Sequence, residues 1–347
     1  MKHFGVSIIV TVILMAVAGW WGYSNAGFSG ALTALWITGV LGVMEVSLSF
    51  DNAVVNASVL KDWNAFWQKL FLTVGILVAV FGMRLVFPLA IVAVATGLDM
   101  LAVWNMAITT PSEYSRHLTE VHAEVAAFGG AFLLLVFLNF MFDDDKEVHW
   151  IGWIEERANR LGAESLSVLL ALVAVGIAVE MVPAEKRFPV LYAGVAGVAI
   201  YLAVGWLSGL LEEDPEEAKA LGKTVQRGSI GGFLYLEVLD ASFSFDGVIG
   251  AFAITSDVVI IMLGLAIGAM YVRSVTVYLV HKGTLDEFIY LEHGAHWAIG
   301  ILAVIMFASV QYHIPEWFTG LSGVAFILVS LWSSVRWKRR EALHSGA

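Results

Sequence analysis

Two short acidic motifs lie inside long apolar stretches of the chain. They are Glu45-Val-Ser-Leu-Ser-Phe-Asp51-Asn52 and Glu237-Val-Leu-Asp240-Ala-Ser-Phe-Ser-Phe-Asp246-Gly247. A charged side chain in the middle of a membrane helix costs roughly 2.5–3.5 kcal/mol, so these carboxylates must face one another, a counter-charge or water. Hard divalent cations such as Mn²⁺, Mg²⁺ and Ca²⁺ prefer carboxylate, amide and hydroxyl oxygens. The motifs therefore predict a divalent-cation site, and its candidate ligands are Glu45, Asp51, Asn52, Glu237, Asp240 and Asp246.

Two arginines, Arg84 and Arg273, also fall inside apolar stretches. With every group ionised, five carboxylates and two guanidiniums leave three negative charges, an excess that a divalent cation together with a proton would remove. Protonation of one or two carboxylates is the competing solution. We interpret the arginines as partners that orient the motif carboxylates when no ion is bound. Pairing that only holds the helices together stays an alternative.

Helical periodicity places part of each motif on one face. The two polar stripes are Glu45, Ser49 and Asn52 in the first motif and Glu237, Asp240 and Ser244 in the second. Asp51 and Asp246 fall about 120° away from these stripes on an unbroken helix. For all the carboxylates to converge, the helices must unwind near residues 47–51 and 242–247, where serine and glycine weaken them. We therefore predict a break in both motif helices.

Histidines occur near the start of two other apolar stretches. His122 and Glu124 could form an access site for a cation on one side of the membrane. On the other side, His293 and His296 could titrate near neutral pH and take part in proton coupling. In both places, polar residues that only anchor a helix end at the interface are the alternative.

The composition of the chain shows which elements must position these residues. Of its 347 residues, 59% are hydrophobic and 14% charged, whereas a soluble domain has about a quarter charged. The net charge of −11 argues against binding to nucleic acid, and the absence of cysteine excludes thiolate metal sites and disulfides. We expect an integral membrane protein with no separate soluble domain and no bound cofactor.

Apolar stretches bounded by charge predict an all-α transmembrane bundle of about ten spans. They are placed near 4–22, 30–58, 68–97, 121–142, 164–183, 188–211, 229–255, 257–281, 290–311 and 317–335. With both termini cytoplasmic, fourteen lysines and arginines lie inside and three outside, a strong positive-inside bias. The first span resembles a signal peptide, but we favour a retained anchor. The expected location is the bacterial inner membrane.

The two halves of the chain share a pattern. Both motifs contain Ser-Phe-Asp, and an arginine follows each one helix later. His122 and His293 each precede a glycine by seven residues at the start of corresponding helices. The motifs lie five spans apart, so the repeats should be inverted, as in many transporters. The expected parts are an anchor (1–29), a first repeat (30–163), connecting helices (164–228), a second repeat (229–335) and a basic tail (336–347).

The motifs resemble those of the TerC superfamily of integral membrane proteins. The match includes Gly247-Val-Ile and Ala253-Ile-Thr after the second motif, and the closest branch is one described as a domain of unknown function. The resemblance implies a metal-ion transporter, with manganese efflux and tellurite resistance as the known associations. It also implies that the six acidic and amide positions above bind the ion. Where many TerC proteins have Asp-Ser, this chain has Asp246-Gly247, which removes one hydroxyl ligand.

The leading hypothesis is a carrier that exports Mn²⁺ or a related divalent cation, with coupling to protons left open. Its partners would be the lipid bilayer and the cation, and the sequence does not indicate an oligomeric state. One alternative is a membrane scaffold that assists metalation or assembly of exported proteins. An intramembrane enzyme is disfavoured, because the spans contain no Gly-x-Gly-Asp pair, His-Glu-x-x-His motif or serine–histidine dyad.

Overall fold

The computed structural model describes residues 4–345, apart from Ile76, 144–145, Glu147, 160–163, 212–227 and 283–286. Within this part of the chain the regular structure is entirely helical, which confirms the predicted all-α class. The helices are α1 (Gly5–Leu48), α2 (Phe50–Leu60), α3 (Ala65–Leu70), η1 (Phe71–Gly75), η2 (Val78–Val86), α4 (Phe87–Thr96), α5 (Met100–Thr109), α6 (Pro111–Glu120), α7 (His122–Phe142), α8 (Gly152–Asn159), α9 (Glu164–Met181), α10 (Ala184–Leu211), α12 (Ile230–Ile254), α13 (Val258–Lys282), α15 (Leu291–Ser309) and α16 (Glu316–Ser345).

The first helix, α1, is a hairpin rather than one straight rod. Its backbone leaves helical geometry at Ala26 and Gly27, where Gly27 has a φ of 65°. The two arms then pack so closely that a Cβ at Gly22 would lie 2.4 Å from the carbonyl oxygen of Gly30. Glycine tolerates both the positive φ and this approach. α1 therefore contains the first predicted span and most of the second, which continues into α2.

Long apolar helices recur along the chain and identify an integral membrane protein. Among the described residues, seven helices are long and apolar enough to cross a bilayer, with the α1 hairpin counted once. α12 is of similar length but is not one of the seven, because it contains three acidic residues. α9 is slightly shorter. Each of the ten predicted stretches is thus helical over most of its length.

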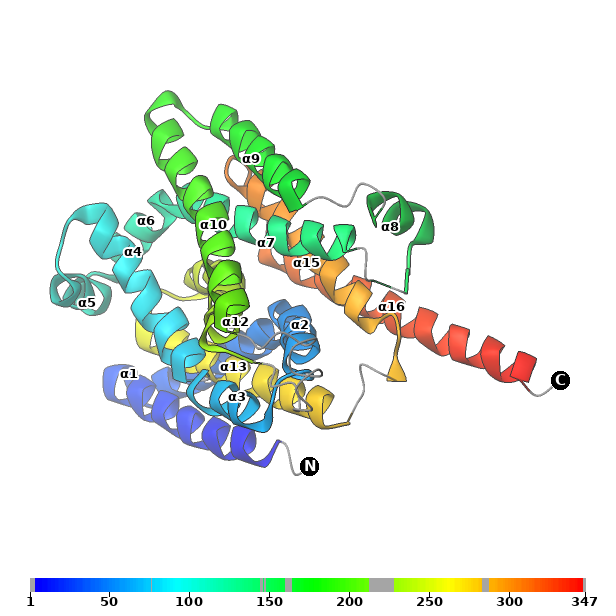
Figure 1. Cartoon of the computed structure of the whole chain (residues 1–347). Coiled ribbons are helices and arrows are strands. Elements are labelled where there is room, and N and C mark those ends of the chain that lie inside the picture. Colours follow the sequence, from blue (N-terminus) through cyan, green and yellow to red (C-terminus); the bar gives the residue numbers. More distant parts are fainter. Residues whose placement is uncertain are drawn as a thin grey trace.

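The helices divide into a central and a peripheral group. In the most apolar stretch of each helix, 61–72% of the residues of α7, α13 and α15 are buried. In α1, α10 and α16 the corresponding share is only 17–28%. In Figure 1, α1 and the pair α9 and α10 lie on opposite flanks, with α2 and α12 between them. Large exposed side chains such as Trp20, Trp36 and Phe188 cover the peripheral helices. These surfaces suit contact with lipid.

The third span combines several helical geometries. α3, η1, η2 and α4 follow one another, and η1 and η2 are π-helical. π-helical turns are rare and are often found at functional sites, and this stretch carries Arg84. Pro88 lies in the first turn of α4, where its missing N–H costs little.

The structure breaks the first motif helix and leaves the second intact. Ser49 has φ −109° and ψ 15° and separates α1 from α2, within the predicted region 47–51. α12 runs continuously from Ile230 to Ile254, so the predicted break at 242–247 is wrong. Inside that region the Ser242 hydroxyl donates to the Val238 carbonyl 2.9 Å away, a bond within the helix.

The two motif helices run antiparallel, as inverted repeats require. Leu60 at the end of α2 belongs to the same core cluster as Phe233 near the start of α12. Leu41 of α1 belongs to a second cluster with Val248, toward the other end of α12. The start of one motif helix therefore lies beside the end of the other.

Each motif helix also crosses the arginine-bearing helix of the other repeat at a glycine. Gly264 lies nine residues before Arg273, and a Cβ there would be 2.5 Å from the Leu41 Cβ of α1. Gly75 lies nine residues before Arg84, and a Cβ there would be 2.7 Å from Oε1 of Glu237 in α12. These matched crossings bring the acidic motifs of both repeats to the centre of the bundle.

Candidate cation site

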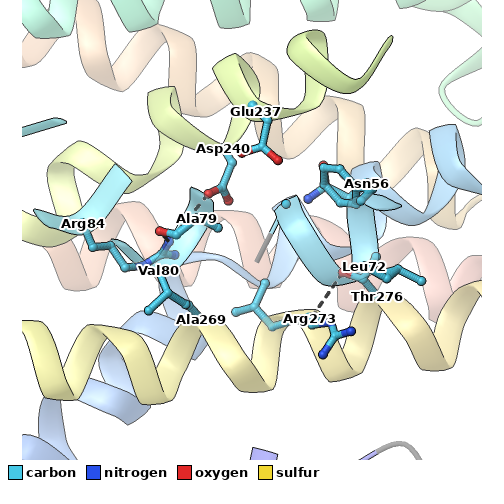
Figure 2. Close-up of a pocket in the computed structure, with 13 residues that line it drawn as sticks. Asn56, Leu72, Ala79, Val80, Arg84, Glu237, Asp240, Ala269, Arg273 and Thr276 are labelled. Atoms are coloured by element: carbon cyan, nitrogen blue, oxygen red, sulfur yellow. Dashed lines mark hydrogen bonds and ion pairs between the residues drawn. The ribbon is translucent and has the colours of Figure 1, made fainter. Parts of the chain in front are cut away.

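Arg84 lies at the centre of a buried polar cluster. Its guanidinium forms an ion pair with Glu45 of α1, and Nε donates to Glu45 Oε1 at 3.1 Å. Nη1 lies 3.6 Å from Oδ2 of Asp240 in α12 and donates to the Ala79 carbonyl oxygen at 2.5 Å (Figure 2). All three charged side chains are buried. One arginine thus joins a carboxylate from each repeat.

Two further motif residues complete this cluster. The Ser49 hydroxyl, at the helix break, donates to Glu45 Oε1 at 3.1 Å. The Asn52 amide donates to Asp240 Oδ1 at 2.5 Å and so links the motif helices directly. With the Ser-Phe-Asp sequences aligned, Glu45 and Asp240 are equivalent residues, each six before its aspartate. The predicted polar stripes therefore do face one another.

Glycines make room for the Glu45 carboxylate. A Cβ at Gly247 would lie 2.9 Å from Glu45 Oε2, and a Cβ at Gly268 of α13 would lie 2.3 Å from the Glu45 Cβ. The side chain of a serine at position 247 would occupy the space next to this carboxylate. The departure from the Asp-Ser pattern at Asp246-Gly247 thus has a steric reason in this chain.

A small cavity of about 40 Å³ adjoins the cluster. Its polar lining comes from Asn56, Arg84, Glu237, Asp240, Arg273 and Thr276. Both carboxylate oxygens of Glu237, Oδ2 of Asp240 and Oδ1 of Asn56 are buried and have no hydrogen-bond partner among the described residues. Figure 2 shows these three side chains around the same space. A buried carboxylate without a partner is costly, so this cavity suits a cation or water.

Of the two remaining predicted ligands, Asp51 and Asp246, Asp51 does not join this cluster. Asp51 is buried and its Oδ1 accepts the Asn52 backbone N–H at 3.0 Å. Its Oδ2 faces α16, where a Cβ at Gly323 would lie 3.0 Å away. The side chain of Asp246 lies outside the described residues, although its backbone is part of α12. In the described part of the chain, no three histidine or acidic side chains form a ready metal-ligand group.

The second intramembrane arginine has a different environment. Arg273 lines the same cavity as Glu237 and Asp240, and its Nε is buried without a hydrogen-bond partner in the described part of the chain. Arg273 also lines an apolar hollow between the first arm of α1, η2 and α13. The predicted role of orienting carboxylates is therefore filled by Arg84, while Arg273 forms no ion pair with a carboxylate in the described part of the chain.

The four residues predicted to support the site lie away from the small cavity. His122 lines a larger hollow on the face where α7 begins, and Glu124 Oε2 is buried without a partner among the described residues. His293 lies 3.0 Å from Glu155, and His296 stacks on Phe140 with ring centroids 3.7 Å apart. The structure thus gives His293 and His296 packing partners at the opposite face.

Sequence reasoning missed the importance of Glu155. Glu155 lies in the short helix α8, and its side chain is fully buried. Its carboxylate accepts a hydrogen bond from Trp297 Nε1 at 3.0 Å. It also lies 3.0 Å from His293 Nδ1 and 3.7 Å from Lys146 Nζ. Burial alone would raise the pKa of Glu155, but these hydrogen bonds and charges lower it from 4.5 to about 2. In the sequence, the only sign of this contact is that His293 and Trp297 are four residues apart and so lie on one face of a helix.

Fold and site together define a polytopic helical membrane protein with a buried cluster of carboxylates and arginine. One family profile, described as Protein of unknown function (DUF475), matches residues 50–341. The chain belongs to this family. In the comparisons with curated proteins and with solved structures, nothing matched.

Proposed function

We propose that the protein is a carrier for a divalent metal cation, with Mn²⁺ favoured and export as its direction. The observation that carries this proposal is that both carboxylate oxygens of Glu237 have no hydrogen-bond partner among the described residues, beside Asp240 and a 40 Å³ cavity. Oxygen ligands in a buried cavity suit Mn²⁺, Mg²⁺ or Ca²⁺. The likeness of the motifs to the TerC superfamily supports manganese and export.

Charge supports the same proposal. Around the site, three described carboxylates (Glu45, Glu237 and Asp240) and the two arginines leave one negative charge when all are ionised. A bound cation would balance this excess. Arg84 already lies between Glu45 and Asp240, so in this account it holds the carboxylates together until the ion competes for them. Ion binding and movement of Arg84 would then be coupled.

Inverted repeats around a buried site are typical of alternating-access carriers. The break at Ser49 and the π-helical third span are irregular backbone that the membrane tolerates only where protein or a cavity shields it. We propose that the ion meets the protein at these irregular elements. The orientation with both termini cytoplasmic, in a bacterial inner membrane, belongs to the same proposal, as does exchange of the cation for protons.

A membrane scaffold is the second candidate function. The observation that favours it is that Arg84, Glu45, Asn52 and Asp240 contact one another across four helices, as a purely structural network would. A scaffold does not explain why both oxygens of Glu237 are left without partners. It predicts that neutral substitutions of Glu237 leave every activity of the protein intact.

Uptake of Mn²⁺ into proteoliposomes tests the carrier. The wild-type protein should catalyse flux, and Glu237→Gln should reduce it at least tenfold without lowering the melting temperature. Glu180→Gln is the matched control, because Glu180 lies at the surface 2.9 Å from Arg187. Folded wild-type protein that moves neither Mn²⁺, Mg²⁺ nor Ca²⁺ would contradict the carrier and favour the scaffold.

A further inference from the structure

A second, larger cavity of about 380 Å³ opens on the membrane face where α7 begins and α15 ends. Its mouth is lined by polar side chains from α6, α7 and the segment between α15 and α16, among them Thr119, His122, Gln311 and His313. Gln311 and His313 are exposed. A cavity with this lining and an exposed rim suits water and ions better than lipid.

The inner end of this cavity lies beside the Arg84 cluster. Leu48, Phe243 and Gly247 line it there. Leu48 directly precedes the helix break at Ser49, and Gly247 lies so close to Glu45 that a Cβ would be 2.9 Å from its carboxylate oxygen. A hollow that starts at the protein surface therefore ends one residue from the Arg84 cluster.

The opposite side of the site is closed by packed aromatic rings. Phe71 lines the small cavity beside Glu237. Its ring makes edge contacts with Trp63 and Phe233, at centroid distances of 6.4 and 6.0 Å. All three belong to one core cluster of buried residues. The two faces thus differ in access to the site.

We propose that the large cavity is the water-filled route between the cation site and the face of the membrane that carries His122. The structure then represents the conformation open to that face, which the charge bias predicts to be extracytoplasmic. The inference rests on the proposed carrier function. The occupant of the route is a hydrated divalent cation, because the polar rim and the carboxylate at its inner end suit a cation.

Cysteine labelling tests the route, since the natural chain contains no cysteine. Leu302→Cys and Ile305→Cys place thiols on the cavity wall formed by α15, while Val304→Cys is a matched control on the same helix. Val304 is 59% exposed and is not part of that wall. Gln311→Cys at the rim reports which face the reagent reaches. The probe is a charged, membrane-impermeant methanethiosulfonate, and each variant is first checked for a wild-type melting temperature.

We expect Ile305→Cys and Leu302→Cys to react within about tenfold of the Gln311→Cys rate, and Val304→Cys at least a hundredfold more slowly. Modification of Ile305→Cys should then reduce Mn²⁺ flux at least tenfold. Cavity cysteines as slow as Val304→Cys, with intact flux in the unmodified protein, would overturn the route alone. Fast labelling with unchanged flux would also overturn it. Absence of flux in the unmodified wild type would overturn the carrier, and the route with it.

Discussion

The two repeats carry the same kinds of residue and use them differently. Arg84 of the first repeat contacts Glu45, Asp240 and the Ala79 carbonyl oxygen. Arg273 of the second repeat lines a cavity beside Glu237 with its Nε unpartnered among the described residues. The proposed carrier needs two inverted states, and a repeated motif with different contacts at equivalent positions suits that proposal. In its opposite state, Arg273 would take a carboxylate and Arg84 would release one.

The serines of the two motifs differ in the same way. Ser49 lies at a helix break and donates to Glu45 at 3.1 Å. Ser244, its equivalent, lies within the continuous α12, and its buried hydroxyl has no partner in the described part of the chain. In the first repeat, the polar side chains thus bond to one another around Arg84. In the second repeat, polar atoms are left without a partner among the described residues. Four experiments test this difference.

Removal of the two arginines should have the largest and most unequal effect. Arg84→Ala leaves Glu45 and Asp240 buried without a counter-charge, which should destabilise the protein by about 3–5 kcal/mol. Arg273→Ala should cost less than about 1 kcal/mol, because Arg273 has no carboxylate partner of that kind. Unfolding in detergent, followed by tryptophan fluorescence, measures both. Equal losses would contradict the assignment of different roles.

The protein should lose stability in acid because of Glu155, which lies at the membrane face opposite the large cavity. Its pKa of about 2 lies below the ordinary value of 4.5, so its stabilising effect is complete above about pH 4.5 and is lost as the pH falls toward 2. The lowered pKa corresponds to at most about 3 kcal/mol. Glu155→Gln should remove that part of the pH dependence between pH 5 and 3. The equivalent change at the open face, Glu124→Gln, is the control, and an acid profile unchanged by Glu155→Gln would refute this role.

The matched glycine crossings should respond differently to a methyl group. Gly264→Ala would place its Cβ 2.5 Å from the Leu41 Cβ and 3.1 Å from the Thr38 carbonyl oxygen, close to the backbone of α1. Such overpacking costs about 1–3 kcal/mol. Gly75→Ala meets only the end of the Glu237 side chain and the Phe71 ring, which can move, so its cost should stay below about 1 kcal/mol. Melting temperatures of the two variants decide the order, and the reverse order would contradict the packing described here.

The smallest difference is expected at the serines. Ser49→Ala removes a buried hydrogen bond to Glu45 and should cost about 1 kcal/mol. Ser244→Ala removes a hydroxyl that has no partner among the described residues, so stability should be unchanged or slightly higher. Chemical denaturation of both variants beside wild type is the measurement. A larger loss for Ser244→Ala would show that its hydroxyl is used.

Much of the fold could be predicted because the bilayer leaves few choices. Apolar stretches of about 20 residues must be helices, so the predicted spans match the observed ones. The hairpin in α1 follows from the polar gap between two such stretches. The π-helical form of η1 and η2 could not be predicted, since it depends on how the third span packs around Arg84. The burial of Glu155 depends on contacts between α8 and α15 that no local pattern reports.

The site was predicted in part. Opposite charges inside a membrane must pair, so the meeting of Arg84 with Glu45 and Asp240 follows from their types. The prediction that both motif helices break rested on the convergence of all carboxylates. That premise is not met in this structure, because Asp51 faces α16 at Gly323. The continuous α12 already presents Glu237 and Asp240 on one face, so no unwinding is needed there.

The central claim is that Glu237, whose two carboxylate oxygens have no hydrogen-bond partner among the described residues, binds a divalent cation together with Asp240. Electron paramagnetic resonance of Mn²⁺ titrated into the purified protein tests it directly, because the free ion gives a signal that disappears on binding. Wild type and Glu180→Gln should bind with equal affinity, and Glu237→Gln should bind at least tenfold more weakly. Equal binding by all three proteins, or no binding to folded wild type, would contradict the account.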